Sequence, residues 1–195
     1  MSDAETLAAY DARCADYAAL SEPDERPALA RFVAALPKGG AALDLGCGPG
    51  FDAARMAAAG LVVTALDPSP AMVAAARSRG VAARLGRIEA LTAEAAFDGV
   101  WAAWSLHHLP HADWPDALAR IRRALRPGGL LFLGVKAGEG EARDALGRFY
   151  AYVEAAPLRA MLAAAGLEPD AVEAGEDVGL DGRTARTLQV FARAR

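Results

Sequence analysis

The sequence predicts one α/β domain, in which a doubly wound and mostly parallel sheet ends in an antiparallel pair of strands at its C-terminal edge. Short apolar runs alternate with segments of helical periodicity along most of the chain, and glycine-rich turns separate them. The chain has 195 residues and is 54% hydrophobic, which suffices to bury the core of a single domain without a disulfide or a metal. No stretch of linker composition divides it.

Each predicted element follows from a local pattern. A largely helical region over residues 1–36 comes first. Apolar runs that end in turn residues then predict strands at 41–45, 61–66, 81–85, 99–104 and 130–135. Helical periodicity between the runs predicts helices at 52–59, 70–79 and 113–125. Short strands that alternate with helices favour parallel pairing through right-handed crossovers.

The C-terminal part has a different pattern. A helix at 157–165 is stopped by Gly166, and a late strand at 187–192 has a candidate partner at 171–174. Two strands so close in sequence predict an antiparallel edge pair. The domain then divides into a helical lid segment, a cofactor-binding core, and a substrate-side insert with the C-terminal strands, at residues 1–36, 37–136 and 137–195.

Composition and charge exclude several classes of partner. The net charge of −4 provides no basic field for a nucleic acid, and no apolar run is long enough to span a membrane. The N-terminus is acidic, unlike a signal peptide. Cys14 and Cys47 lack the spacing of a metal site and indicate free thiols in a reducing compartment. We therefore expect a cytoplasmic protein with a small-molecule partner, without nucleic acid or membrane; the oligomeric state stays open.

The sequence LDLGCGPG at 43–50 follows the first predicted strand and precedes the first full helix after it. In an open α/β sheet, ligands bind beyond the carboxyl ends of the strands, and glycines let the backbone approach them closely. Asp67 ends the second predicted strand, 21 positions after Gly46. An acid there is placed to accept hydrogen bonds from both ribose hydroxyls. The alternative is a tight turn followed by a helix-capping aspartate.

The loop is not a dinucleotide fingerprint, because Phe51 stands where the third glycine of that motif would be. Asp44 and Asp52 put acids beside the loop, which would repel a pyrophosphate. Asp44 suits an ammonium group instead, directly or through water. An acid near the loop and another at the ribose together indicate an amino acid joined to adenosine.

Four segments carry a family resemblance: LDLGCGPG, ALDPSPAMVAAAR, FDGVWAAWSLHHLP and ALRPGGLLFL. They resemble the successive motifs of class I S-adenosylmethionine-dependent methyltransferases, most of all the small-molecule branch that does not act on nucleic acids. The resemblance covers nearly the whole chain. It implies a Rossmann-like fold, S-adenosylmethionine as cofactor with S-adenosylhomocysteine as product, and an N-terminal helical lid over the cofactor.

The resemblance also implies roles for single residues. Asp44 would bind the amino group, Asp67 the ribose hydroxyls, and the glycines would pass along the methionine and ribose. Met72 would pack on the adenine, and Ala102 would face the methionine end through its backbone. The full set of implied cofactor contacts is Asp44, Gly46, Gly48, Gly50, Asp67, Met72, Ile88, Glu89 and Ala102. Arg87 departs from the family, which commonly has an acid there for the adenine amino group.

Methyl transfer requires chiefly that the acceptor be positioned and water excluded, and a base only if the acceptor arrives protonated. His107, after the fourth predicted strand, is the best-placed base; its alternative is a structural or cofactor-flanking role. Tyr17 is a candidate lid residue over the methyl site, or else a core aromatic. We expect His108 to be structural. Pro110 interrupts the histidine group that ends at His111, so no metal is predicted.

The acceptor side has weaker signals. Arg143, Arg148 and Tyr150, with nearby Lys136, form a candidate cationic rim for a small anionic acceptor. The alternative for 138–152 is a solvated helix with ordinary salt pairing. The motifs that hold a nucleobase, a protein glutamine, a cytosine or a catechol-bound metal are absent from the sequence.

The leading hypothesis is therefore methyl transfer from S-adenosylmethionine to a small, possibly anionic acceptor by in-line displacement. A non-catalytic module that binds S-adenosylmethionine, as a sensor or a partner subunit, is the alternative. A nicotinamide-dependent oxidoreductase is a third hypothesis, although the chain lacks the Tyr-x-x-x-Lys pair of short-chain dehydrogenases.

Overall fold

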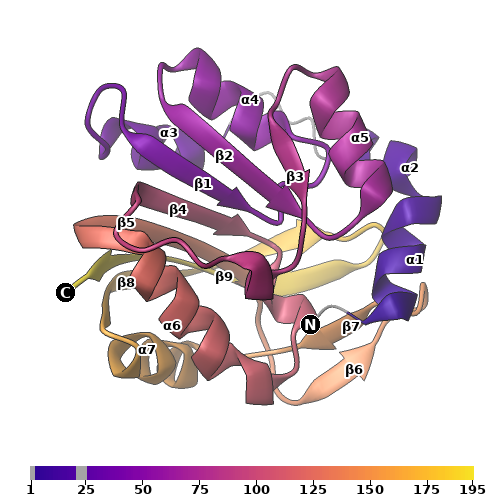
Figure 1. The fold of residues 1–195 in the computed structure, drawn as a ribbon. Helices are drawn as coiled ribbons and strands as arrows, with labels where there is room; N and C mark the ends of the chain where they lie inside the picture. The colour runs from indigo at the N-terminus through magenta and orange to yellow at the C-terminus, as the bar shows by residue number, and fades with distance from the viewer. Residues whose placement is uncertain (1–2, 21–25) are drawn as a thin grey trace.

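The computed structural model describes residues 3–20 and 26–195 and confirms the α/β class (Figure 1). Its N-terminal region is helical in three pieces, α1 (Ala4–Ala12), α2 (Cys14–Leu20) and α3 (Pro27–Ala34). The predicted helical region also includes residues 21–25, which lie outside the described part of the chain. None of the described helices is long and apolar enough to cross a membrane.

The sheet has seven strands in the order β3-β2-β1-β4-β5-β9-β8. The first five in chain order are mutually parallel, as predicted: β1 (Ala41–Leu45), β2 (Val62–Asp67), β3 (Ala83–Leu85), β4 (Phe97–Ala103) and β5 (Leu125–Lys136). The chain order reverses between β1 and β4, so the carboxyl ends of these two strands form the switch point at which open α/β sheets bind ligands.

Helices cover both faces of the sheet. On one face α3, α4 (Phe51–Ala58) and α5 (Pro70–Ser78) pack on β1, β2 and β4. On the other face α6 (Trp114–Ala124) and α7 (Ala155–Ala164) bury the larger core with β4, β5 and β9. Short 3-10 turns complete the connections: η1 (Ile88–Ala90), η2 (Leu106–His108) and η3 (His111–Asp113).

Local chemistry explains where the helices begin and end. The hydroxyl of Ser69 accepts the backbone N–H of Met72 at 3.1 Å, and Pro70 occupies the first turn, so α5 starts there. Gly80, at φ +81°, follows its end. This boundary agrees with the predicted helix at 70–79.

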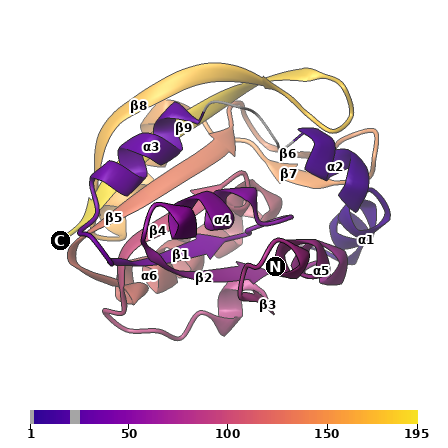
Figure 2. The ribbon, with the colours of Figure 1, turned by 90° about the horizontal axis from the view of Figure 1, so that it is seen from above.

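The predicted antiparallel edge pair is confirmed in β8 (Leu167–Val178) and β9 (Thr184–Ala194). Val172 pairs with Val190 and Ala174 with Leu188, and β9 also pairs antiparallel with β5. Figure 2 shows β8 and β9 as a long yellow arm that extends toward the side of the molecule on which α1 and α2 lie. This arm forms one wall of the site described below.

The segment at 138–152 is a two-stranded hairpin of β6 (Glu141–Arg143) and β7 (Phe149–Ala151), so the alternative of a solvated helix is wrong. The Asp144 carboxylate accepts the backbone N–H groups of Leu146 and Arg148, at 2.9 and 3.0 Å, and builds the turn. Gly147 takes φ +80° within it. An aspartate that serves the turn backbone outweighs the helical propensity of the surrounding alanine and leucine.

Candidate functional site

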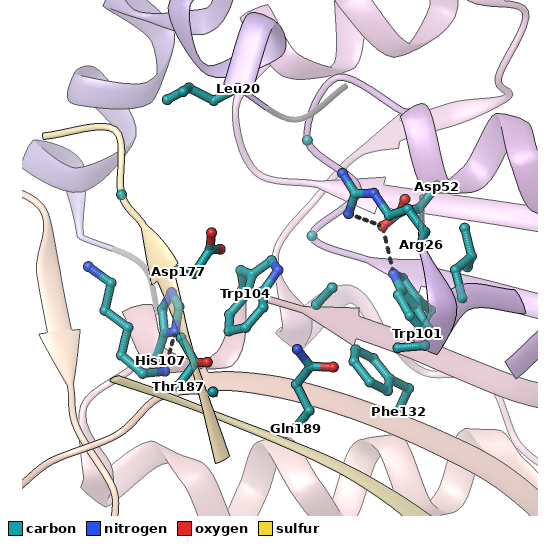
Figure 3. Close-up of a pocket in the computed structure, with 18 of the residues that line it drawn as sticks. Leu20, Arg26, Asp52, Trp101, Trp104, His107, Phe132, Asp177, Thr187 and Gln189 are labelled. Atoms are coloured by element: carbon teal, nitrogen blue, oxygen red, sulfur yellow. Dashed lines mark hydrogen bonds and ion pairs between the residues drawn. The ribbon is translucent and has the colours of Figure 1, made fainter. Parts of the chain in front are cut away.

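A cavity of about 640 Å³ opens at the carboxyl ends of β1, β4 and β5, a volume typical of small-molecule sites. The glycine loop, the lid helices α1 and α2, and the β8–β9 arm surround it (Figure 3). A second cavity of about 50 Å³ lies on the other side of Gly46, which lines both. The site is therefore divided into two connected regions by the glycine loop.

The glycine loop is held against the turn after β4. A Cβ atom on Gly46 would lie 2.3 Å from Cβ of Ser105, and Gly46 has φ +79°, so only glycine fits this position. The Ser105 hydroxyl donates to the carbonyl of Leu45 at 2.7 Å and fixes the two segments together. Gly48 and Gly50 also have positive φ, and α4 begins directly after them. The loop therefore presents backbone to the cavity, as predicted.

Asp44 lies at the end of β1, is only 2% exposed and lines the main cavity. Its Oδ2 atom is buried and has no hydrogen-bond partner among the residues that the structure describes. Burial, with further contributions from Asp52 and Asp67, raises the pKa of this carboxyl well above its usual range. A buried carboxyl without a partner requires a donor, and a cationic donor would lower its pKa again.

Asp67 ends β2 and lines neither cavity, although its neighbours Leu66 and Pro68 line the smaller one and its partner Gly48 lines the main one. Oδ2 accepts the backbone N–H of Gly48 and Oδ1 that of Ser69, both at 2.8 Å. Each carboxylate oxygen still has a second lone pair for a ligand hydroxyl. Burial raises the pKa of Asp67 to about 6. The alternative role as helix cap is wrong, because Ser69 caps α5.

The smaller cavity contains the segment predicted to meet the adenine edge. Ile88 and Glu89 line it together with Arg87 and Leu109. Met72, at 2% exposure, is buried beneath the lid, where the Cys14 thiol contacts its sulfur at 3.6 Å, and it lines neither cavity.

Ala102 is in the larger hydrophobic core, on the face of the sheet opposite the main cavity. Side chains alternate along a strand, so the next residue, Ala103, lines the cavity instead.

The lid helices close over the glycine loop and α5. The Asp11 carboxylate accepts the Ser69 hydroxyl at 2.5 Å. Tyr17 lines the cavity close to Gly48, on which a Cβ atom would lie 3.4 Å from its ring, and its ring meets that of Tyr10 edge to face at 5.3 Å. Tyr17 is therefore a lid residue of the cavity in this structure.

His107 is in η2, is 2% exposed and lines the main cavity. Its Nδ1 accepts the backbone N–H of Lys136 at 3.2 Å. A backbone N–H can only donate, so the proton of the neutral ring is on Nε2. Burial, followed by the charges of its neighbours, lowers the pKa of His107 well below its usual range. The ring is therefore built to donate a hydrogen bond from Nε2, and this geometry does not suit the predicted role of base.

His108 is structural, as predicted. Its Nδ1 donates to the carbonyl of Phe149 at 2.7 Å, so Nε2 accepts the Tyr10 hydroxyl at 2.8 Å. Burial lowers its pKa to about 4. Nε2 of His111 lies 2.8 Å from the carbonyl of Tyr152. Within residues 3–20 and 26–195, no three metal-ligating side chains come together.

Arg148 links the β6–β7 hairpin to the lid. It is 2% exposed, and Nη2 lies 2.6 Å from the carboxylate of Asp144. Its Nη1 donates to the Tyr10 hydroxyl at 3.2 Å. Arg148 lines the cavity, but its charge is already paired with Asp144.

The other members of the predicted rim differ in position. Tyr150 lines the cavity, and the Lys136 ammonium lies 3.8 Å from its ring centroid. Arg143 does not line the cavity; its guanidinium lies 3.2 Å from Asp3 and 3.3 Å from Glu5 on the lid. Of the three predicted acceptor contacts, the structure brings Arg148 and Tyr150 to the cavity and leaves Arg143 outside.

Four residues that line the main cavity were not identified as site residues from the sequence: Arg26, Trp101, Trp104 and Gln189. Arg26 donates to Asp52 at 3.2 Å, and the Trp101 indole donates to the same oxygen at 3.0 Å (Figure 3). Trp104 stands directly after β4 with φ +61°, a left-handed conformation that is rare for a bulky residue. Gln189 on β9 reaches the cavity from 85 positions further along the chain. The sequence indicated Asp52 as an acid beside the loop, but it did not indicate Arg26 and Trp101 as the partners of that acid.

Taken together, the glycine loop at the switch point, Asp67 hydrogen-bonded to that loop, and the buried Oδ2 of Asp44 form a candidate ligand site at the strand ends of a Rossmann-like fold. Residues 42–129 match the family model described as "Methyltransferase domain". Over this range the chain has a methyltransferase domain, and the relatives and the solved structure that it resembles are named as methyltransferases.

Two curated relatives illustrate the similarity. The chain is 34% identical over 151 residues to 27-O-demethylrifamycin SV methyltransferase of Amycolatopsis mediterranei, a match that covers 67% of this chain and 55% of the relative. It is 39% identical over 104 residues to ubiquinone biosynthesis O-methyltransferase of Xanthomonas oryzae pv. oryzae, covering 49% and 42%. The chain therefore spans about half the length of the curated relatives it matches.

A solved structure matches over a longer range. The 1,6-didemethyltoxoflavin-N1-methyltransferase of Burkholderia thailandensis, with 1,6-didemethyltoxoflavin and S-adenosylhomocysteine bound, superposes with a TM-score of 0.79 at 28% identity. The match covers 98% of this chain and 88% of that one. The arm and the hairpin thus lie within the matched range.

Proposed function

We propose that this chain transfers the methyl group of S-adenosylmethionine to a small planar acceptor bound between the end of β4 and the β8–β9 arm. The observation that carries the proposal is the buried, unpartnered Oδ2 of Asp44 beside the glycine loop. An ammonium group satisfies both needs of this carboxyl, a hydrogen-bond donor and a positive charge. The amino group of S-adenosylmethionine is such a donor.

The remaining residues fit the same cofactor. Asp67 would accept the ribose hydroxyls with its free lone pairs, and the smaller cavity beside Ile88 and Glu89 would hold the adenine. Arg26, which lines the main cavity near Asp44, would meet the carboxylate of the methionine. Tyr17 would cover the glycine loop and exclude water.

When bound, S-adenosylmethionine supplies a methyl carbon activated by a sulfonium, from which the acceptor's lone pair displaces S-adenosylhomocysteine in one in-line step. His107 would orient the acceptor by donating from Nε2 to an acceptor oxygen or ring nitrogen. An anionic group on the acceptor would meet Lys136, since Arg148 and Arg143 are paired with carboxylates.

A planar acceptor is supported by the walls of the main cavity. Trp104 lines it, and an indole ring of this kind stacks on flat ligands. The relatives named above are small-molecule methyltransferases by their printed names, which is consistent with a small acceptor.

A thermal shift assay with S-adenosylhomocysteine and, separately, NADH tests the cofactor. At about 100 times its dissociation constant a ligand adds roughly 2.7 kcal/mol, or about 5 to 11 °C for a domain of this size. We expect that shift with S-adenosylhomocysteine alone. A shift with NADH instead would overturn the proposal, and S-adenosylhomocysteine binding without turnover of any planar phenol or cyclic imide would favour a sensor.

Two variants locate the binding. Asp67→Ala should weaken the binding of S-adenosylhomocysteine by more than about 1 kcal/mol, because it removes charge-assisted hydrogen bonds. Asp98→Ala is the matched control: its carboxylate caps the opposite end of β1 by accepting the N–H of Ala41 at 2.7 Å. It should leave the affinity unchanged. Equal affinities in both variants would remove Asp67 from the ribose site.

A further inference from the structure

Gln189 is the single carboxamide side chain of the protein: the 195 residues include one glutamine and no asparagine. It lines the main cavity, and among the described residues its side chain has no hydrogen-bond partner. A carboxamide is a neutral group that donates and accepts side by side. Its position inside the cavity, without a structural partner, points to a ligand.

The register of the sheet puts Gln189 at the end of a row of small residues. Ala103 on β4 pairs with Gly134 on β5, and Gly134 pairs with Gln189 on β9. Residues that are directly opposite across strands point to the same face. The neighbouring row, Trp101, Phe132 and Phe191, is filled by aromatic rings of the core. The row of Ala103, Gly134 and Gln189 therefore leaves space beside the row of aromatic residues.

Trp104 occupies this space. A Cβ atom on Gly134 would lie 3.6 Å from the Trp104 indole, an ordinary contact, so the indole lies against the sheet over Gly134. Figure 3 shows Trp104 in the centre of the cavity with Gln189 beside it. Trp104 holds φ +61° to reach this place, a strained conformation of the kind that collects at ligand sites.

We propose that Trp104 is a stacking platform and that Gln189 reads the edge of the acceptor: a planar ring in which a carbonyl stands next to a ring N–H, as in a cyclic amide or imide. The carboxamide N–H donates to the carbonyl while its oxygen accepts the ring N–H, the two-bond pairing by which glutamine reads a base edge. This inference rests on the proposed function and narrows its acceptor to one class.

The test uses the wild-type protein saturated with S-adenosylhomocysteine and two probes of the same ring size, lumazine and 1,3-dimethyllumazine. The methyl groups remove the ring N–H donors and leave the ring system intact. Equilibrium dialysis at a mildly acidic pH, which keeps the ring N–H groups protonated, gives both dissociation constants. We expect lumazine to bind about tenfold more tightly than its dimethyl analogue.

Gln189→Leu replaces the carboxamide by a slightly shorter apolar side chain, so the preference for lumazine should fall to about twofold or less while both rings still bind. Glu168→Gln is the matched control, because Glu168 is on β8, pairs with Arg193 of β9 and does not line the cavity. That variant should keep the tenfold preference.

The outcomes separate this inference from the proposed function. Equal binding of the two probes, binding of neither probe, or a preference that survives in Gln189→Leu would overturn the role of Gln189. Each of these results is read in protein shown to bind S-adenosylhomocysteine. Failure to bind S-adenosylhomocysteine would instead overturn the proposed function itself.

Discussion

The two ends of the main cavity are built by different means. At the cofactor end, one loop and the ends of two neighbouring strands provide nearly every group, and backbone N–H groups make the contacts. At the acceptor end, side chains arrive from the lid, η2, the β6–β7 hairpin and β9, and they are held by one another. The cofactor end is therefore local in sequence, and the acceptor end depends on the tertiary fold.

The two ends also have opposite electrostatics. Asp44 and Asp67 are buried carboxyls whose pKa values are raised. His107 and His108 are buried imidazoles whose pKa values are lowered, by burial first and then by nearby cations such as Arg148. The cavity is thus acidic where the proposal puts an ammonium and cationic or neutral where it puts the acceptor.

The largest effect should come from the side-chain network of the acceptor end. Arg148→Met leaves the Asp144 carboxylate, 6% exposed, without its partner, and a broken buried pair costs about 3 to 5 kcal/mol. Urea unfolding measures the loss. The double variant with Asp144→Asn should lose less, because its amide oxygen can still accept the turn N–H groups and no unpaired charge remains. A single variant within about 1 kcal/mol of the wild type would mean that the hairpin does not depend on this pair.

At the cofactor end the largest effect should come from the backbone. Gly46→Ala forces a side chain against Ser105 at φ +79°, which adds an overlap of about 1 to 3 kcal/mol to a conformational cost of about 1 to 2 kcal/mol. Gly80→Ala is the matched control, at φ +81° with nothing within 4 Å of the added atom. In urea unfolding, Gly80→Ala should lose only the conformational cost of about 1 to 2 kcal/mol, without the cost of an overlap. Equal losses would contradict the close approach of the loop to the turn after β4.

The same difference explains what the sequence could predict. The glycine loop, Asp67 and the parallel strands were predicted because each depends on a few adjacent residues and on the general position of ligands in α/β sheets. Gly48 and Asp67 do meet, through a hydrogen bond of 2.8 Å. Ala102 was expected to face the methionine through its backbone; its side chain lies in the larger core, and the side chain that lines the cavity is that of Ala103.

The acceptor end could be predicted only in part. Arg148 and Tyr150 reach the cavity, whereas Arg143 is drawn to carboxylates on α1, more than 130 positions away in the chain. Gln189 and Trp104 depend on which residues of β4, β5 and β9 are in register, and periodicity within one strand carries no such information. The one available signal was compositional, a single carboxamide in the whole chain.

The opposite electrostatics predict opposite pH dependences. His108 has a folded pKa of about 4 against an ordinary 6.5, so the unfolded chain binds more protons between these values. Its contribution to stability is present above about pH 6.5 and is lost as the pH falls toward 4, by about 3 kcal/mol in all. Asp67 has a folded pKa of about 6, above its ordinary value, so the folded chain binds more protons between about pH 4 and 6. Its contribution therefore increases stability as the pH falls through that interval.

Unfolding free energies at several pH values check this comparison. His108→Gln should lose less stability than the wild type as the pH falls from neutrality toward 4, because it has no imidazole to protonate. Asp67→Asn should lose more, because the compensating carboxyl is gone. Parallel curves for the three proteins would show that neither group titrates as its burial predicts.

The smallest effect separates the two arginines of the hairpin. Arg143 is 41% exposed and outside the cavity, so Arg143→Ala should cost less than about 1 kcal/mol of unfolding free energy, as surface ion pairs do. It should also leave binding of 4-hydroxybenzoate, an anionic planar probe, unchanged in protein loaded with S-adenosylhomocysteine. Lys136→Met is the comparison, because its ammonium lies in the cavity over Tyr150. Lys136→Met should weaken the binding of 4-hydroxybenzoate about fivefold. If Arg143→Ala weakens the probe as much, the cationic rim extends onto the lid surface and the acceptor end is wider than the cavity described here.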